Sequence, residues 1–260
     1  MELKDASAIV TGSSSGIGAA IAKELAGRGC RVTINYSRNE KGAREVAEKC
    51  ESLGAETLVV QADVSEDEDC RKLVDAALKH FGGLQILINN AGTTKFCRHQ
   101  ELSGLDKQDF MNLYAVNLVG PFQMTRAAEA ELRKAEVSHI VNMGSIAALT
   151  GVGSSIAYAA SKGALVTMTM SLARVLGPQI RVNAVCPGFV AGEWLKKGLG
   201  EKAYDKLKSQ YEDAAPLNRT ATPETVARTV SSLIGGADLT TGETLIIDGG
   251  THLHTAPLRR

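Results

Sequence analysis

Short apolar runs alternate with helix-length amphipathic segments along this chain of 260 residues, and no other sequence feature constrains its fold as strongly. The apolar runs are rich in Val and Ile, as strands covered on both faces should be. Strands are predicted at residues 7–11, 31–35, 57–61, 85–89, 139–143, 180–186 and 244–247. Helices are predicted at about residues 17–28, 40–53, 66–80, 106–134, 155–176 and 223–234. This order predicts an α/β fold, a single doubly wound domain over residues 1–260 whose seven-stranded parallel sheet carries helices on both faces.

Two stretches depart from the regular pattern. Asn117, Gly120 and Pro121 interrupt the longest helical segment. All three residue types are poor in helix interiors, so we expect a kink whose freed carbonyl could hold a water molecule. A surface Asn followed by a helix break is the alternative. Residues 188–222 show no clear pattern, and we expect an irregular substrate lid there, because long loops inside compact domains are usually functional.

Composition excludes several classes of partner. The chain has 29 basic and 29 acidic residues, and because nucleic acids and anionic membranes usually need a basic face, neither is expected as a partner. No apolar run approaches the roughly 20 residues of a membrane span, and the first residues are too polar to start a secretory signal. Five cysteines without a CxxC pair favour reduced thiols in a cytoplasmic protein. His252 and His254 have no third ligand nearby, so no metal site is expected.

A glycine-rich turn follows the first predicted strand, where residues 11–18 read TGSSSGIG. Gly12 permits a tight turn, Gly16 lets the backbone approach a pyrophosphate, and Gly18 allows close packing of helix on strand. The helix that follows directs its N–H groups at the phosphates. We therefore expect a nucleotide-binding Rossmann domain rather than an ordinary turn. The expected contacts in this loop are Gly12, Ser14, Ser15, Gly16 and Ile17.

Tyr158 and Lys162 stand four residues apart in a helical segment and so share one face. A free tyrosine has a pKa of about 10, and a neighbouring ammonium group lowers that pKa, which proton transfer near neutrality requires. Ser145 follows the fifth predicted strand, at the edge where doubly wound sheets bind ligands. Its hydroxyl could stabilise developing alkoxide charge on a substrate. The alternative is that Tyr158 packs against a neighbouring helix and Lys162 is solvated.

These motifs together resemble the short-chain dehydrogenase/reductase family over nearly the whole chain, from Ser7 to about Gly250. Besides TGSSSGIG and Ser145, the matching motifs are Asp63-Val64, NNAG at 89–92, Asn117, YAASK at 158–162, Pro187-Gly188 and IDGG at 247–250. One departure is Gly144, which stands where many members carry another serine.

The resemblance implies an oxidoreductase that interconverts a carbonyl and a secondary alcohol. Tyr158 would be the general acid in reduction and the base in oxidation. Lys162 would lower its pKa and hold the nicotinamide ribose, Ser145 would orient the carbonyl, and Asn117 would anchor a water that links Lys162 to solvent.

The resemblance also implies where a nicotinamide cofactor would lie and how the protein assembles. Asp63 and Val64 would contact the adenine. The other implied cofactor contacts are Asn90, Ala91, Gly92, Tyr158, Lys162, Pro187, Gly188 and Val190. A homotetramer is expected, formed partly through the last strand.

The end of the second strand indicates which cofactor binds. NAD-binding members usually carry an acid there, but this chain reads Tyr36-Ser37-Arg38, with no carboxylate until Glu40. Ser37 and Arg38 can contact a 2′-phosphate, so NADP(H) is predicted and NAD(H) is left open.

The substrate is less constrained. The chain is similar to 3-oxoacyl-carrier-protein reductases and to generic ketoreductases and sugar dehydrogenases. Residues 135–138 and 177–179 lack the arginines that grip a carrier protein, and Arg133 is close but not aligned. A ketoacyl substrate, a sugar or another alcohol therefore stay open. A non-catalytic NADP(H)-sensing regulator is a distant alternative, since sensing needs no proton donor. Trp194 is predicted either to cover the substrate or to pin the lid.

Overall fold

The computed structural model describes residues 2–253. In this part of the chain, seven parallel strands form one sheet in the order β3-β2-β1-β4-β5-β6-β7. The strands are β1 (Ser7–Val10), β2 (Arg31–Tyr36), β3 (Thr57–Gln61), β4 (Ile86–Asn89), β5 (Ser138–Met143), β6 (Ile180–Pro187) and β7 (Thr244–Ile247). The predicted α/β fold class is confirmed. The strand order reverses between β1 and β4, which creates the crevice where such sheets bind ligands.

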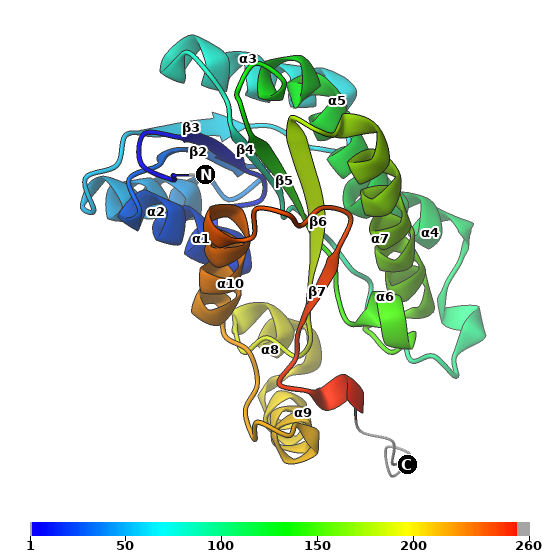
Figure 1. Cartoon of the computed structure of the whole chain (residues 1–260). Helices are drawn as coiled ribbons and strands as arrows, with labels where there is room; N and C mark the ends of the chain where they lie inside the picture. The colour runs from blue at the N-terminus through cyan, green and yellow to red at the C-terminus, as the bar shows by residue number, and fades with distance from the viewer. Residues whose placement is uncertain (1, 254–260) are drawn as a thin grey trace.

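Helices cover both faces of this sheet (Figure 1). The first layer consists of α1 (Gly16–Gly27), α2 (Glu40–Glu51) and α10 (Pro223–Gly236), which pack on one core cluster. The second layer consists of α3 (Asp67–Phe81), α5 (Gly120–Leu132) and α7 (Ile156–Leu176), which pack on another. The inner strands β1, β2, β4, β5 and β6 are buried almost throughout, which agrees with their mostly apolar sequences, whereas the edge strands β3 and β7 are only partly buried. None of the described helices is long and apolar enough to cross a membrane.

The kink predicted in the longest helical segment is confirmed. That segment divides into α4 (Lys107–Tyr114), a π-helix (Ala115–Val119) and α5. Single π turns inside helices often occur at functional sites, and this one contains Asn117.

The prediction that residues 188–222 are irregular is wrong. This stretch contains α8 (Glu193–Leu199) and α9 (Glu201–Ala214), which lie beyond the carboxyl end of β6 (Figure 1). The apolar pattern of α9 is hard to recognise because Tyr204 is its only buried residue. Tyr204 and Tyr211 each lie 5.4 Å from the Phe189 ring, centroid to centroid, so a small aromatic cluster anchors the helix.

Shorter elements complete the chain. A short helix α6 (Ala147–Thr150) follows β5, and 3-10 turns lie at Leu102–Gly104 and Thr251–Leu253.

Candidate functional site

The glycine-rich loop lies between β1 and α1, at the carboxyl edge of the sheet. Gly12 and Gly16 have φ angles of +61° and +57°, which L side chains rarely adopt. A Cβ on Gly12 would lie 2.9 Å from Ala91 Cα, and a Cβ on Gly18 would collide with the Asn90 side chain. Glycine is therefore required by conformation or by space at all three predicted positions. Ser15 and Gly16 are exposed where α1 begins.

Asn35, a residue that the sequence reasoning missed, fixes this loop to the sheet. It is buried near the end of β2, and its Oδ1 accepts a hydrogen bond from Gly12 N–H at 3.0 Å. Its Nδ2 donates to Ala62 O at 3.0 Å, and its N–H donates to Ser13 Oγ at 2.9 Å. One amide thus joins the loop to two strands. An Asn near the end of a buried strand, at the edge of the sheet where the glycine-rich loop lies, was the available signal.

The NNAG segment packs against the same loop. Thr11 Oγ1 accepts hydrogen bonds from the N–H groups of Asn90 and Ala91 at 2.9 and 3.0 Å. Asn90 Nδ2 donates to Thr11 O at 2.9 Å and to Gly12 O at 3.1 Å. The Asn90 side chain is therefore occupied in holding the two loops together.

Tyr158, Lys162 and Ser145 come together at the carboxyl end of β5. Ser155 caps α7 by accepting a hydrogen bond from Tyr158 N–H at 3.2 Å. Lys162 is buried, and its Nζ donates to Met143 O at 2.7 Å and lies 5.9 Å from the Tyr158 ring centroid. The Ser145 hydroxyl lies near the Tyr158 hydroxyl, and Ser145 Oγ accepts a hydrogen bond from Ala147 N–H at 3.2 Å. The alternative of a packing tyrosine and a solvated lysine is therefore wrong.

Asn117 lies in the same group, which contradicts the alternative that it is a surface residue. It is completely buried, and its Oδ1 accepts a hydrogen bond from Thr93 N–H at 2.8 Å. Its Nδ2 donates to Thr93 O and to Ser161 Oγ, both at 3.0 Å. A Cβ on Gly92 would lie 3.5 Å from Asn117 Oδ1 and 3.6 Å from Lys162 Nζ, so this glycine keeps space open between the two polar groups.

Burial dominates the electrostatics of the group. It lowers the pKa of Lys162 to about 8. It also raises the pKa of Tyr158 above its usual range, and the nearby Ser145 hydroxyl opposes this only in part. The expectation that Lys162 lowers the pKa of Tyr158 is therefore not met in the protein alone. The physical reason is that Lys162 Nζ points to Met143 O, whereas the phenol is removed from water.

The remaining predicted contacts lie at the ends of β2 and β3. Tyr36 is buried, whereas Ser37 and Arg38 are exposed. No residue of the described chain pairs with the Arg38 guanidinium. Asp63 Oδ1 accepts hydrogen bonds from Ser65 N–H at 3.0 Å and Ser65 Oγ at 2.7 Å, which shape the turn after β3. Val64 is buried against Gly120.

The predicted contacts after β6 are held by neighbouring segments. Gly188 N–H donates to Ile247 O at 2.9 Å, and a Cβ there would lie 2.6 Å from Asp248 Cβ. Val190 pairs with Ala221. Pro187, the last residue of β6, accepts a hydrogen bond from Ile146 N–H at 2.9 Å.

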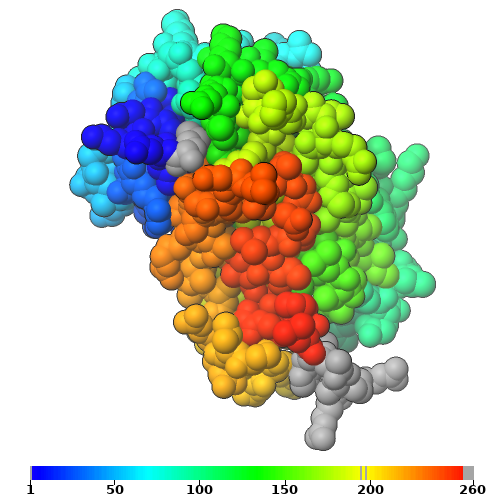
Figure 2. Space-filling view, in the orientation of Figure 1, coloured from blue at the N-terminus to red at the C-terminus, as the bar shows by residue number. Residues whose placement is uncertain are grey.

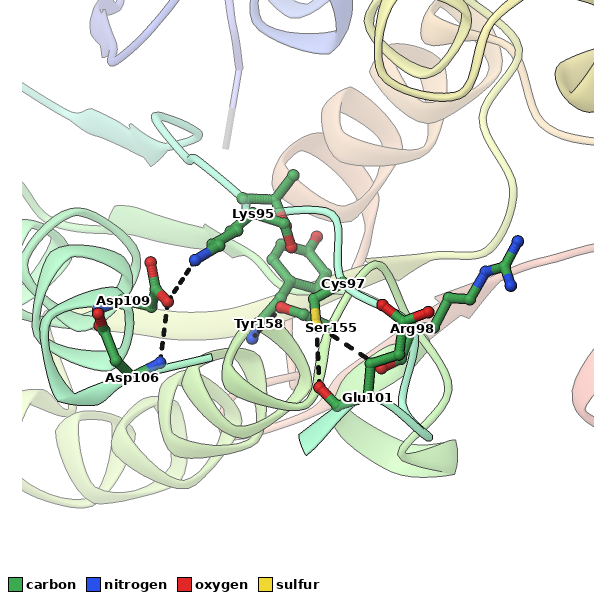
Figure 3. A network of polar contacts seen from close by, with 9 residues as sticks. Lys95, Cys97, Arg98, Glu101, Asp106, Asp109, Ser155 and Tyr158 are labelled. Atoms are coloured by element: carbon green, nitrogen blue, oxygen red, sulfur yellow. Dashed lines mark hydrogen bonds and ion pairs between the residues drawn. The ribbon is translucent and has the colours of Figure 1, made fainter. Parts of the chain in front are cut away.

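The loop after β4 forms a wall beside α7, near Tyr158 (Figure 3). Cys97 N–H donates to Ser154 O at 2.9 Å, next to the cap of α7, and Lys95 pairs with Asp109 at 2.6 Å. Phe96 packs against Gly198 of α8 so closely that a Cβ on Gly198 would collide with its ring. This contact joins the wall to the region beyond β6. The Trp194 side chain lies outside the described structure.

His252 does not form the start of a metal site. Its Nδ1 lies 2.9 Å from Asp248 Oδ2, and His254 lies outside the described residues. Residues 2–253 contain no group of three or more His, Cys, Asp or Glu side chains that could hold a metal ion.

Known proteins resemble the chain over almost its whole length. A family model described as enoyl-(acyl carrier protein) reductase matches residues 12–252. The granaticin polyketide synthase ketoacyl reductase 2 of Streptomyces violaceoruber is 40% identical over 95% of this chain and 96% of its own length. A short-chain dehydrogenase/reductase from Burkholderia xenovorans has a TM-score of 0.89 and 39% identity, covering 95% of this chain and 98% of its own. A short-chain dehydrogenase from Burkholderia cenocepacia in complex with NADP has a TM-score of 0.87 and 34% identity, covering 97% and 100%.

Proposed function

The chain belongs to the short-chain dehydrogenase/reductase family of oxidoreductases acting on CH–OH groups, and from this premise we propose that it reduces a ketone with NADP(H), using Tyr158 as the proton donor. One observation carries the proposal: Tyr158, Ser145 and Lys162 meet at the carboxyl edge of the sheet, opposite the glycine-rich loop.

The residues present fit a dinucleotide. The positive φ angles at Gly12 and Gly16 and the exposed start of α1 form a cradle that can accept phosphates. Gly12, Ser14, Ser15, Gly16 and Ile17 would hold the pyrophosphate. Asp63 and Val64 would hold the adenine, Asn90, Ala91 and Gly92 would line the floor, and Pro187, Gly188 and Val190 would lie over the nicotinamide. Tyr36, Ser37 and Arg38 would hold the 2′-phosphate, because the Arg38 guanidinium has no partner in the described chain.

The bound cofactor would supply the hydride, and side chains of the protein would transfer the proton. In reduction, Ser145 holds the substrate oxygen beside the Tyr158 hydroxyl, which gives that oxygen its proton as negative charge develops. The raised pKa of Tyr158 keeps the phenol protonated at neutral pH, as a donor must be. Lys162 lies within reach of Tyr158 and stabilises the phenolate that remains. Asn117 holds the Thr93 backbone beside Lys162 and supports the route by which a proton returns from solvent.

We propose that residues 1–260 form one catalytic domain in which residues 188–222, with α8 and α9, act as the substrate lid. The Phe96–Gly198 contact supports this, because it links the lid region to the wall beside Tyr158. A cytoplasmic location is in keeping with the five free cysteines.

We also propose that the protein is a homotetramer. Strand β7 is an edge strand, and its chain is exposed on the face shown in Figure 2. Leu245 on this strand is exposed, and exposed apolar edges favour pairing with another chain.

A ketoacyl thioester is the first substrate class to test, because the Streptomyces violaceoruber relative bears the name of a ketoacyl reductase. Recognition of a carrier protein is less supported. Arg133, the arginine nearest the expected carrier site, binds Glu129 at 2.9 Å and Gln179 at 3.3 Å, so internal contacts occupy it.

Replacement of Tyr158 by Phe tests the proposal. The Tyr158→Phe variant should bind NADPH with unchanged affinity and lose at least about 100-fold in kcat for ketone reduction, because general acid catalysis is worth that much or more. Tyr114→Phe, on α4, is the matched control and should keep wild-type turnover. Near-normal turnover by Tyr158→Phe would exclude the proton-donor role. Tighter binding of NADH than of NADPH by the wild-type protein would exclude the cofactor assignment.

A further inference from the structure

Cys186, near the end of β6, is a fully buried thiol that the proposed chemistry does not use. Around it, β5 and β6 stay paired beyond the last residue of β5. Gly144 N–H donates to Val185 O at 2.8 Å, and Ile146 N–H donates to Pro187 O at 2.9 Å. These two hydrogen bonds continue the strand register, in which Gly144 lies opposite Cys186 and Ser145 lies opposite Pro187.

The thiol also contacts the backbone of the candidate catalytic serine. The Ser145 backbone N–H lies close enough to the Cys186 thiol to lower its pKa in part. Burial raises the pKa of Cys186 to about 11, so the thiol is neutral at physiological pH and is a poor nucleophile. The thiol can therefore act here only as a hydrogen-bond acceptor and as a side chain that fills space.

Gly144 lies against the Cys186 thiol. A Cβ at Gly144 would lie 2.5 Å from Cys186 Sγ, whereas the next atoms, Val185 O and Val166 Cγ2, lie 3.4 and 3.8 Å away. A contact of 2.5 Å is impossible, so any side chain at position 144 must displace the sulfur. In this structure the Cys186 sulfur is the one atom that a Cβ at position 144 would overlap.

We propose that Cys186 is a positioning residue for Ser145, and that Gly144 and Cys186 form a matched pair that sets the turn presenting the serine hydroxyl to Tyr158. The thiol holds the Ser145 N–H, and the absence of a side chain at Gly144 leaves room for it. This inference rests on the proposed function, in which Ser145 holds the substrate oxygen.

A double-mutant cycle tests the pair. Gly144→Ser should lower kcat for ketone reduction at least tenfold, because the new side chain pushes Cys186 and the Ser145 backbone apart. Cys186→Ala should lower kcat less, by about threefold, since it removes the acceptor without adding bulk. In the double variant the serine side chain enters the space left by sulfur, and kcat should return to within threefold of Cys186→Ala. Cys186→Ser, which keeps an acceptor, should stay within twofold of the wild-type kcat.

The affinity for NADPH and the Tm of the cofactor-free protein are measured on the same variants. NADPH affinity should change less than threefold throughout, so that the loss is confined to kcat. The matched control pair is Gly235→Ser with Cys50→Ala, near the ends of α10 and α2, and it should show no coupling in kcat. If Gly144→Ser does not fold, the same double-mutant cycle is measured with Gly144→Ala.

Three results would overturn the inference. The first is a double variant whose loss in kcat equals, within twofold, the product of the losses in the two single variants. The others are coupling seen in Tm but not in kcat, and a strong loss of kcat in Cys186→Ser. Tyr158→Phe is assayed alongside. If it keeps turnover, the proposed function fails, whereas an inactive Tyr158→Phe with no coupling between positions 144 and 186 rejects the positioning role alone.

Discussion

Buried polar side chains connect the loops of the site to the sheet, and Asn35 makes several such connections at once. Asn35→Ala would leave the Gly12 N–H and the Ala62 carbonyl without this partner. We expect it to cost about 1–3 kcal/mol in the free energy of unfolding. NADPH affinity should also fall, since Gly12 begins the phosphate loop. Urea unfolding and fluorescence titration measure the two effects. The exposed Asn112→Ala serves as control, and equal NADPH affinity in both variants would contradict the role.

A second residue-scale prediction concerns His139 on β5. Its buried ring accepts a hydrogen bond from Arg181 Nη2 at 3.0 Å, and burial, with the nearby Arg181 charge, lowers its pKa to about 3. Between pH 6.5 and 3 the unfolded chain takes up a proton at this residue and the folded protein does not. Stability should therefore fall as pH falls through this window, by up to about 1.4 kcal/mol per pH unit. His139→Gln keeps an acceptor and should flatten this slope in urea unfolding at pH 7, 6 and 5. Identical slopes in the two proteins would refute the assignment.

At the scale of elements, local periodicity predicted the strands and most helices, because their apolar faces are wide and regular. It failed for α8 and α9. Helix α9 buries only Tyr204 and packs on Phe189, and α8 contacts Phe96, so both depend on partners that are distant in the sequence. The kink at Asn117 was predictable from residue types. Its burial was not, because Thr93 and Ser161 approach it only through the tertiary fold.

Contacts between residues distant in the sequence also explain why the motifs did not reveal all of the site. The motifs marked Tyr158, Lys162 and Ser145, whose spacing is local. The partnerships of Asn35 with Gly12 and of Cys186 with Gly144 join positions 23 and 42 residues apart, so they become visible only once the strands are paired.

The contact between α8 and the wall beside Tyr158 gives an element-scale prediction. Gly198→Val has no room beside Phe96, so it should move α8 away from the wall. If α8 is part of the substrate lid, KM for the ketone should rise at least fivefold while NADPH affinity changes less than twofold. Gly236→Val, at the end of α10 with open space around it, is the matched control. Steady-state kinetics with both variants test this prediction. An unchanged KM in Gly198→Val would show that α8 is not part of the substrate lid.

At the scale of the whole molecule, the charge balance and the exposed apolar side chains together favour self-association. A chain with zero formal net charge has little long-range repulsion between copies. The second helical layer, the helices α4 and α6 that contact α7, and the π-helix expose large apolar side chains, and exposed apolar patches on a soluble protein often mark an interface. The exposed residues on these elements include Met111, Val119, Phe122, Leu149 and Met170.

Charged substitutions on this layer test the association. The double variant Phe122→Glu and Met170→Glu should sediment as a smaller species than the wild type, because two buried carboxylates without partners would cost several kcal/mol in each interface. Leu53→Glu replaces an equally exposed apolar residue after α2, on the other layer, and should keep the wild-type mass. Sedimentation velocity across a range of protein concentrations measures all three. A wild-type protein that sediments as a monomer would contradict the homotetramer. A double variant with unchanged mass would instead move the interface to another surface, with the β7 edge as the next to test.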